Sequence, residues 1–162
     1  VFFIIFSFNF LNYITMKKIA LLLVFAVLSC QNPYGTVTTE DEKSAIIATV
    51  FKNVGDEQIE YLKDVFSDKM ELVNSQGASS DKTSFIAGVE NMMDLFDDIR
   101  FTDMNGDAEG AEIETNTYAN GIVWTNIWNT FSATGKYTGQ EVNFPFHISY
   151  QWEGNKIIKG KT

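Results

Sequence analysis

Residues 142–152 read VNFPFHISYQW, and this stretch decides the fold. A large apolar or aromatic residue stands at every second position: Val142, Phe144, Phe146, Ile148, Tyr150 and Trp152. The positions between them hold mostly polar residues. A period of two residues is typical of a strand that buries one face, so we expect a strand over Gln140–Glu153 with these side chains on its inner face.

Two further strands are predicted, Gly121–Ala133 before this stretch and Lys156–Lys159 after it. A two-residue hairpin with its tip at Thr138-Gly139 would join the two long strands. This register gives the pairs Phe131–Phe146, Asn129–Ile148 and Ile127–Tyr150. A tip at Gly135-Lys136 would change the pairs, and a bulge would exchange the two faces of one strand.

Helices are predicted in the first half of the folded region. The spacing of Thr39 and Glu42 matches a capping box, and Gly55 follows the apolar stripe of this first helix. A second apolar stripe at helical spacing comes next. A short strand, Lys69–Asn74, separates it from a third, strongly amphipathic helix at Asp81–Phe96.

Composition and charge limit the classes of function. The chain has 162 residues, about one domain, and a formal net charge of −9. All 21 acidic residues follow Cys30, together with 10 basic ones, so nucleic acid is not an expected partner. His147 is the only histidine, and we expect it on the outer face of the sheet. No second ligand stands at metal spacing, so we predict neither a metal nor a cofactor.

The N-terminal residues indicate a targeting segment. Two lysines at 17 and 18 precede ten apolar residues at 19–28, which is typical of a secretory signal. The sequence VLSC, ending at Cys30, resembles the bacterial lipobox, in which the cysteine is lipidated. We therefore expect a protein of the bacterial cell envelope, anchored to the membrane through lipid on Cys30.

This interpretation divides the chain into four parts. Residues 1–15 are upstream sequence or an additional apolar segment, residues 16–29 a lipoprotein signal peptide, residues 30–38 a tether, and residues 39–162 a folded domain. The tether contains Pro33 and Gly35 and has no periodic apolar pattern.

Three helices, a short strand and a run of long antiparallel strands resemble the nuclear transport factor 2-like superfamily, which includes SnoaL-like polyketide cyclases and ketosteroid isomerases. The matching motifs are Gly55-Asp56, Phe66-Ser67-Asp68 and Trp152-Glu153-Gly154-Asn155-Lys156-Ile157, within Glu40–Ile158. The resemblance implies an α+β cone, with three N-terminal helices packed on a strongly curved antiparallel sheet. The family's last strand usually runs further than Thr162, so we expect a truncated end or an incomplete pocket wall there.

The resemblance also implies where catalytic residues would stand. Ketosteroid isomerases use a carboxylate base at the end of the first strand and a donor on the strand that matches residues 142–152. The matching positions here are Asn74 and Ile148. An amide accepts no proton at neutral pH and an isoleucine donates no hydrogen bond, so the sequence argues against isomerase chemistry.

The sequence therefore favours a non-catalytic domain that binds a small, mostly apolar molecule or a partner protein. The expected pocket residues are Asn74, Asn129, Phe131, Phe144, Phe146, Ile148 and Tyr150, with the two asparagines orienting the ligand. Two alternatives stay open. The aromatic side chains could fill a closed core, or the domain could be an enzyme of the cyclase or isomerase type.

Two tryptophans predict an interface. Trp124 and Trp128 are four residues apart on one strand, so they share a face, which we expect to be the outer one. Exposed indoles favour association, and members of the family commonly dimerise through this face of the sheet. We expect a homodimer; the alternative is that a shifted register places both indoles in the core.

Overall fold

The computed structural model describes residues 34–103 and 112–162. The predicted segments at 1–15 and 16–29, the predicted lipidation site Cys30, and residues 31–33 lie outside the described residues. Tyr34–Thr162 forms one of two compact units of the chain. Within the described residues, no helix is long and apolar enough to span a membrane.

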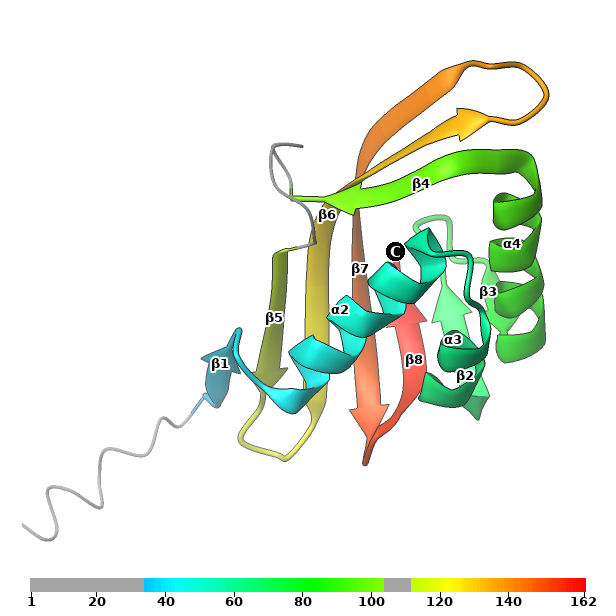
Figure 1. The fold of residues 1–162 in the computed structure, drawn as a ribbon. Helices are drawn as coiled ribbons and strands as arrows, with labels where there is room; N and C mark the ends of the chain where they lie inside the picture. The colour runs from blue at the N-terminus through cyan, green and yellow to red at the C-terminus, as the bar shows by residue number, and fades with distance from the viewer. Residues whose placement is uncertain (1–33, 104–111) are drawn as a thin grey trace, which may run out of the picture. The chain divides into compact units, whose positions relative to one another are not determined.

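The described unit is an α+β structure (Figure 1). In chain order its elements are β1 (Thr36–Thr38), α2 (Glu42–Gly55), α3 (Glu60–Val65), β2 (Phe66–Val73), β3 (Ser79–Asp81), α4 (Lys82–Leu95), β4 (Phe96–Thr102), β5 (Glu112–Thr117), β6 (Val123–Gly135), β7 (Glu141–Glu153) and β8 (Lys156–Lys161). The strands form one sheet in the order β1-β5-β6-β7-β8-β2-β3, and β4 pairs with β6 beyond the end of β5. The strand β1 lies within the stretch interpreted as a tether.

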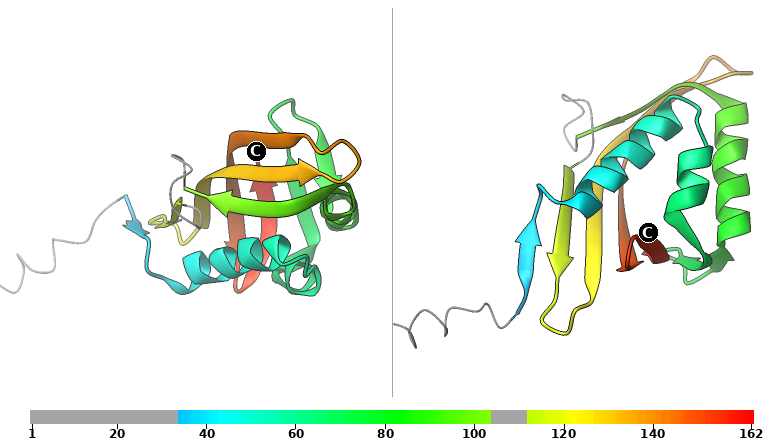
Figure 2. Two further views of the ribbon diagram at one scale, coloured as in Figure 1. Left: turned by 45° about the horizontal axis from the view of Figure 1, so that its top comes forward. Right: turned by 60° about the horizontal axis from the view of Figure 1, so that its bottom comes forward.

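The helices that the structure describes lie on one side of the curved sheet. Figure 2 shows α2 crossing the strands, while α4 stands beside β2 and β3. The apolar core lies between these layers and runs in sequence from Ile47 to Ile157. Because Tyr34–Thr162 encloses this core of its own, we expect the unit to fold as an isolated domain.

The two long strands are confirmed, but the predicted register is wrong by two residues. Phe131 pairs with Phe144 and Asn129 pairs with Phe146. The hairpin loop has four residues, not two, because Gly135 donates its N–H to the carbonyl of Gln140. A displacement of two residues keeps every side chain on its predicted face.

The sheet is mixed rather than antiparallel, which corrects the sequence-based expectation. β8 turns back antiparallel to β7, as predicted, but its other edge pairs in parallel with β2. The strand β2 also begins earlier than the predicted Lys69, at Phe66, which ends the second helix after six residues. Phe66 is almost fully buried and pairs with Ile157.

Helix α2 begins with a cap that the sequence placed two residues too early. Asp41, not Thr39, is the N-cap residue, and its carboxylate accepts from the backbone N–H groups of Lys43 at 2.8 Å and Ser44 at 3.0 Å. These bonds satisfy amide groups that have no partner inside the helix. The helix ends at Gly55, as expected.

A chain of hydrogen bonds continues from this cap into the core. Ser44 donates to the Asp41 carboxylate at 2.8 Å, and its oxygen lies 3.0 Å from the hydroxyl of Thr115. Thr115 lies 2.9 Å from Thr125, which accepts from the indole N–H of Trp152 at 2.8 Å. Each hydroxyl has one proton, so every bond in the chain points from the indole toward the carboxylate.

Thr125→Val should destabilise the domain by about 1–3 kcal/mol, because it leaves the buried Trp152 indole and the Thr115 hydroxyl without one partner each. Thr117→Val, the same change at an exposed position of β5, is the control. Urea unfolding of the two variants measures the difference. Equal stabilities would show that the chain of hydrogen bonds contributes nothing.

Candidate functional site

The concave side of the sheet holds an apolar cavity of about 490 Å³. Helices α2, α3 and α4 and strands β4, β6 and β7 contribute to its wall. The lining residues are Val50, Phe51, Val54, Leu62, Phe85, Val89, Met92, Phe96, Phe101, Phe131, Val142, Phe144, Phe146, His147, Ile148, Tyr150 and Thr162. None of them is an aspartate, glutamate, lysine or arginine, so the side chains of the wall carry no permanent charge.

Five of the predicted pocket residues line this cavity: Phe131, Phe144, Phe146, Ile148 and Tyr150. Their exposure falls along β7. Phe144 is 50% exposed, whereas Ile148 and Tyr150 are 5% and 4% exposed. Phe144 therefore lies where the cavity meets solvent, and Ile148 and Tyr150 line a buried part of its wall.

Aromatic rings form one wall of the cavity. Phe51 of α2 lies 4.7 Å from Phe101 of β4, measured between ring centroids, and 6.2 Å from Phe146. Phe131 lies 5.7 Å from Phe101 and 5.2 Å from Phe144. Contacts of this kind fix ring orientations and so give the wall a defined shape.

Asn74 lies outside the cavity, which corrects its prediction as a pocket residue. It follows the end of β2, is exposed, and its side-chain oxygen accepts from the backbone N–H groups of Gln76 at 3.0 Å and Ala78 at 2.9 Å. The amide thus stabilises the turn into β3, where Gly77 has a φ of 81°. A turn of this type selects asparagine for local reasons.

Asn129 lies on the concave face but is sealed behind the cavity wall. It is 0% exposed, and among the described residues neither atom of its side-chain amide has a hydrogen-bond partner. Its position in the sheet is unusual, because Trp128 pairs with Glu112 of β5 whereas Thr130 pairs with Thr102 of β4. Asn129 therefore marks the point where β6 changes its neighbour.

Tyr150 combines burial with an unused hydroxyl. Its ring packs edge-on against Phe66 at 5.3 Å, and no residue of the described chain forms a hydrogen bond with its hydroxyl. Burial raises the pKa of Tyr150 well above its ordinary value, so the group stays a neutral donor. The sequence predicted this side chain as part of the wall.

His147 lies on the outer face, as the strand period predicts. Its ring stacks on Trp128 with centroids 5.0 Å apart, and the residue is exposed although it also belongs to the lining of the cavity. The part of the chain that the structure describes contains no group of three histidine, cysteine or acidic residues placed to hold a metal ion.

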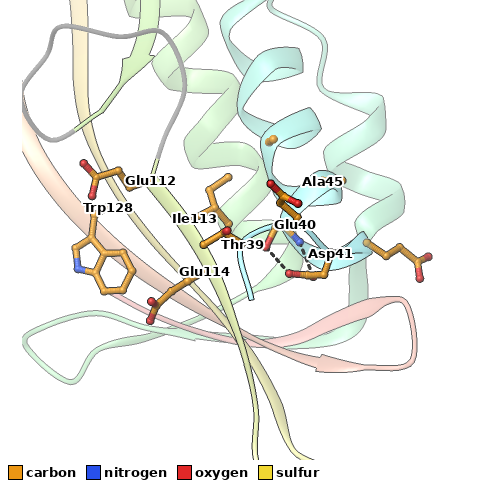
Figure 3. A pocket seen from close by; sticks show the side chains of 11 residues that line it. Thr39, Glu40, Asp41, Ala45, Glu112, Ile113, Glu114 and Trp128 are labelled. Carbon is orange, nitrogen blue, oxygen red and sulfur yellow. Dashed lines mark hydrogen bonds between the residues drawn. The ribbon is translucent and has the colours of Figure 1, made fainter. Parts of the chain in front are cut away.

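A second, acidic groove lies between the start of α2 and β5. Figure 3 shows Glu112, Glu114 and Trp128 on one side of β5, and Glu40 and Asp41 on the side of the helix. Asp41 is already engaged as the N-cap. Sequence reasoning missed this groove because its two walls come from segments about 70 residues apart in the chain.

Comparison with known proteins identifies the fold. No protein-family model matches the chain, and no curated protein sequence is significantly similar to it. Solved structures are similar at low identity, as expected for a fold that many sequences share.

Three of these structures illustrate the likeness. A SnoaL-like polyketide cyclase from Agrobacterium tumefaciens is 16% identical, with a TM-score of 0.55 over 75% of this chain and 89% of that one. A protein with a ketosteroid isomerase-like fold from Catenulispora acidiphila, solved with trimethylamine, is 13% identical, with a TM-score of 0.52 over 72% and 82%. An epoxide hydrolase of the LEH-like type from M. tuberculosis is 11% identical, with a TM-score of 0.53 over 74% and 80%.

Fold and cavity together define an α+β protein with helices packed on a curved sheet around an apolar pocket. More specifically, the chain has the nuclear transport factor 2-like fold, in the form shared by SnoaL-like and ketosteroid isomerase-like proteins.

Asn129→Leu should raise the stability of the domain by about 1–2 kcal/mol, because it replaces a buried, unpaired amide by an apolar group of similar size. The control is Asn126→Leu on the outer face. There the amide oxygen accepts from the Ser149 hydroxyl at 2.7 Å, so its loss should lower the stability of the domain. Thermal unfolding measures both changes. A loss of stability in Asn129→Leu would show that this amide has a partner in the folded protein.

Proposed function

We propose that the domain binds a small, mostly apolar molecule in the concave cavity and does not catalyse a reaction on it. The observation that carries this proposal is an apolar cavity of about 490 Å³ whose lining residues include no aspartate, glutamate, lysine or arginine. A cavity of this size and lining is typical of a small-molecule site. Burial of apolar ligand surface would supply the affinity.

The cavity does not contain the carboxylate base that isomerases of this fold use. A general base must reach the proton that it removes, within hydrogen-bond distance or through one water. The position that resembles the isomerase base is Asn74, on the exposed turn after β2, and the donor position is the buried Ile148. Within the described residues, Tyr150 is the one buried side chain of the wall that can donate a hydrogen bond.

The second candidate function is an enzyme of the cyclase or isomerase type. The fold neighbours favour it, since a polyketide cyclase and an epoxide hydrolase are among them. For this chain, chemistry that relies on a carboxylate base would require an aspartate or glutamate in the wall, and the lining residues include neither. Turnover of a 3-oxo-Δ5 steroid by the purified protein would contradict the non-catalytic proposal.

The cavity predicts a saturable site for one neutral apolar probe. N-phenyl-1-naphthylamine should bind to Tyr34–Thr162 with one site per chain and with enhanced fluorescence. Val89→Trp places an indole in the cavity from α4 and should weaken this binding at least tenfold. The expected loss of binding free energy is of the order gained by burying one large apolar side chain.

Val37→Trp is the matched control, because Val37 is exposed on β1 and far from the cavity wall. Circular dichroism checks that both variants are folded. Absence of saturable binding in the wild type, or equal binding by Val89→Trp, would contradict a site in the cavity and favour a filled core.

We also propose that the domain forms a homodimer through the outer face of its sheet. Trp124 and Trp128 alternate along β6 with the buried Thr125, Ile127 and Asn129, so they share the other face, and both are partly exposed. Their own chain covers them only in part, with His147 against Trp128 and the ammonium of Lys161 6.0 Å from the ring of Trp124. Tryptophans on an open sheet face are typical anchors of an interface.

Trp128→Glu should give a folded monomer, because an interface anchor of this kind contributes about 2 kcal/mol or more to association. Sedimentation velocity compares the variant with the wild type and with Tyr118→Glu, a control at another exposed aromatic residue. A wild-type domain that remains monomeric at high concentration would exclude the dimer.

A further inference from the structure

One end of the sheet exposes several large apolar side chains. The start of β1 and the turn between β5 and β6 lie side by side at this end (Figure 1). Residues 34–39 and 115–135, which form it, contain no aspartate, glutamate, lysine or arginine, although the chain as a whole has 21 acidic residues. The exposed side chains, together called the apolar end, are Tyr34, Val37, Tyr118 and Ile122.

The backbone holds this end together. Thr36 pairs with Thr117 of β5, and a Cβ added to Gly35 would lie 2.9 Å from the Cα of Tyr118. Tyr118 in turn donates its N–H to the carbonyl of Ile122 at 2.9 Å, which closes the turn. The apolar side chains therefore start from backbone that is already ordered, so a partner that covers them has little chain to immobilise.

The chain that precedes the structure limits how far this end can lie from a membrane. Cys30, the predicted lipid attachment site, stands four residues before Tyr34. A fully extended chain spans at most about 3.6 Å per residue, so the two Cα atoms lie within about 14 Å of each other whatever path the chain takes. Each headgroup layer of a bilayer is itself about 5–8 Å thick. Attachment at Cys30 would therefore keep the apolar end at the membrane surface.

The chemistry of the apolar end suits the interfacial layer of a bilayer. Tyrosine is enriched at membrane–water interfaces because its ring is apolar and its hydroxyl reaches water. Tyr34 is 85% exposed and Tyr118 is 48% exposed. The neighbouring β7–β8 turn carries one charge of each sign, Glu153 and Lys156, so this end presents less negative charge to anionic lipid than the acidic chain as a whole.

We propose that the apolar end is a membrane-docking surface, and that Tyr34, Tyr118 and Ile122 enter the interfacial layer of the bilayer to which the chain is tethered. The tether makes this contact intramolecular, so a weak contact is enough to orient the domain. The surface is separate from the cavity, and the inference goes beyond the proposed function.

Docking in this orientation leaves the cavity open to water. Phe144, at the mouth of the cavity, pairs with Phe131. Phe131 is eight residues from Val123, where β6 begins beside the apolar end, or about 26 Å along the strand. The mouth therefore lies beyond the interfacial layer, and a ligand reaches it from the aqueous side.

The experiment tethers the domain to a membrane without relying on lipidation of Cys30. A hexahistidine tag replaces residues 1–30 and binds a nickel-chelating lipid in phosphatidylcholine vesicles. Because Cys30 is the only cysteine of the chain, Ala119→Cys then supplies a unique thiol, in the exposed β5–β6 turn, for an NBD fluorophore. Tyr137→Cys, in the exposed β6–β7 loop at the opposite end, carries the same fluorophore as a control.

On vesicles the fluorophore at position 119 should emit at shorter wavelength than in solution, and lipid with a nitroxide near its headgroup should quench it. The fluorophore at position 137 should show neither effect. Ile122→Glu should abolish both effects at position 119, because a carboxylate enters the interfacial layer unfavourably. Leu95→Glu makes the same change at a residue of similar exposure, 41% against 39%, and should abolish neither.

Equal emission at position 119 on vesicles and in solution would overturn the inference, and so would a shift that survives Ile122→Glu. A shift that develops in solution as the protein concentration rises, without vesicles, would overturn it in favour of a second copy of the chain. Circular dichroism checks that the variants fold, and Tyr118→Glu provides the same test if Ile122→Glu does not. The probe-binding assay for the cavity is independent of these results, so failure here leaves the proposed function intact.

Discussion

The hydrogen-bonded chain from Trp152 through Thr125, Thr115 and Ser44 to Asp41 is the interaction on which the site depends. It crosses β7, β6 and β5 and ends at the N-cap of α2, so it fixes the start of that helix to the sheet. Every hydroxyl in it is buried and uses its one proton, so the loss of one member leaves its neighbours unpaired in a low-dielectric interior. Further along the same helix, Val50, Phe51 and Val54 form part of the cavity wall, so the hydrogen bonds at its start also help to position that wall.

With α2 held in this way, the cavity follows from the sheet. The strand β6 pairs with β5 along its first half and with β4 along its second half, and the change occurs at Asn129. The second half of β6 and the first half of β7 extend beyond β5, together with β4 (Figure 1). These halves include Phe131, Phe144 and Phe146. Gly160 allows β8 to approach Tyr150, because a Cβ there would also lie 2.5 Å from a methyl carbon of Leu72. The exposed Phe144 lies at the mouth of the cavity, and the buried Tyr150 lines the wall next to β8.

The sequence predicted the strand period and the faces correctly, because alternation in VNFPFHISYQW is a local property. It missed the register because the predicted two-residue turn Thr138-Gly139 and the observed four-residue loop both end at Gly139, which has a φ of 66°. It misplaced Asn74 because alignment along the chain does not show where β2 ends and the turn begins. The parallel pairing of β8 with β2 joins segments about 90 residues apart, and no local pattern reports such a contact. The burial of Asn129 and the free hydroxyl of Tyr150 also depend on tertiary neighbours.

The central claim is that the concave side of the domain encloses an open apolar cavity rather than a filled core. Crystals of Tyr34–Thr162 pressurised with xenon test it most directly, since xenon enters apolar cavities without requiring a specific ligand. We expect xenon density between α4 and β7, in contact with Val89 and Ile148. A structure in which aromatic side chains occupy this space and no xenon binds would show that the core is filled.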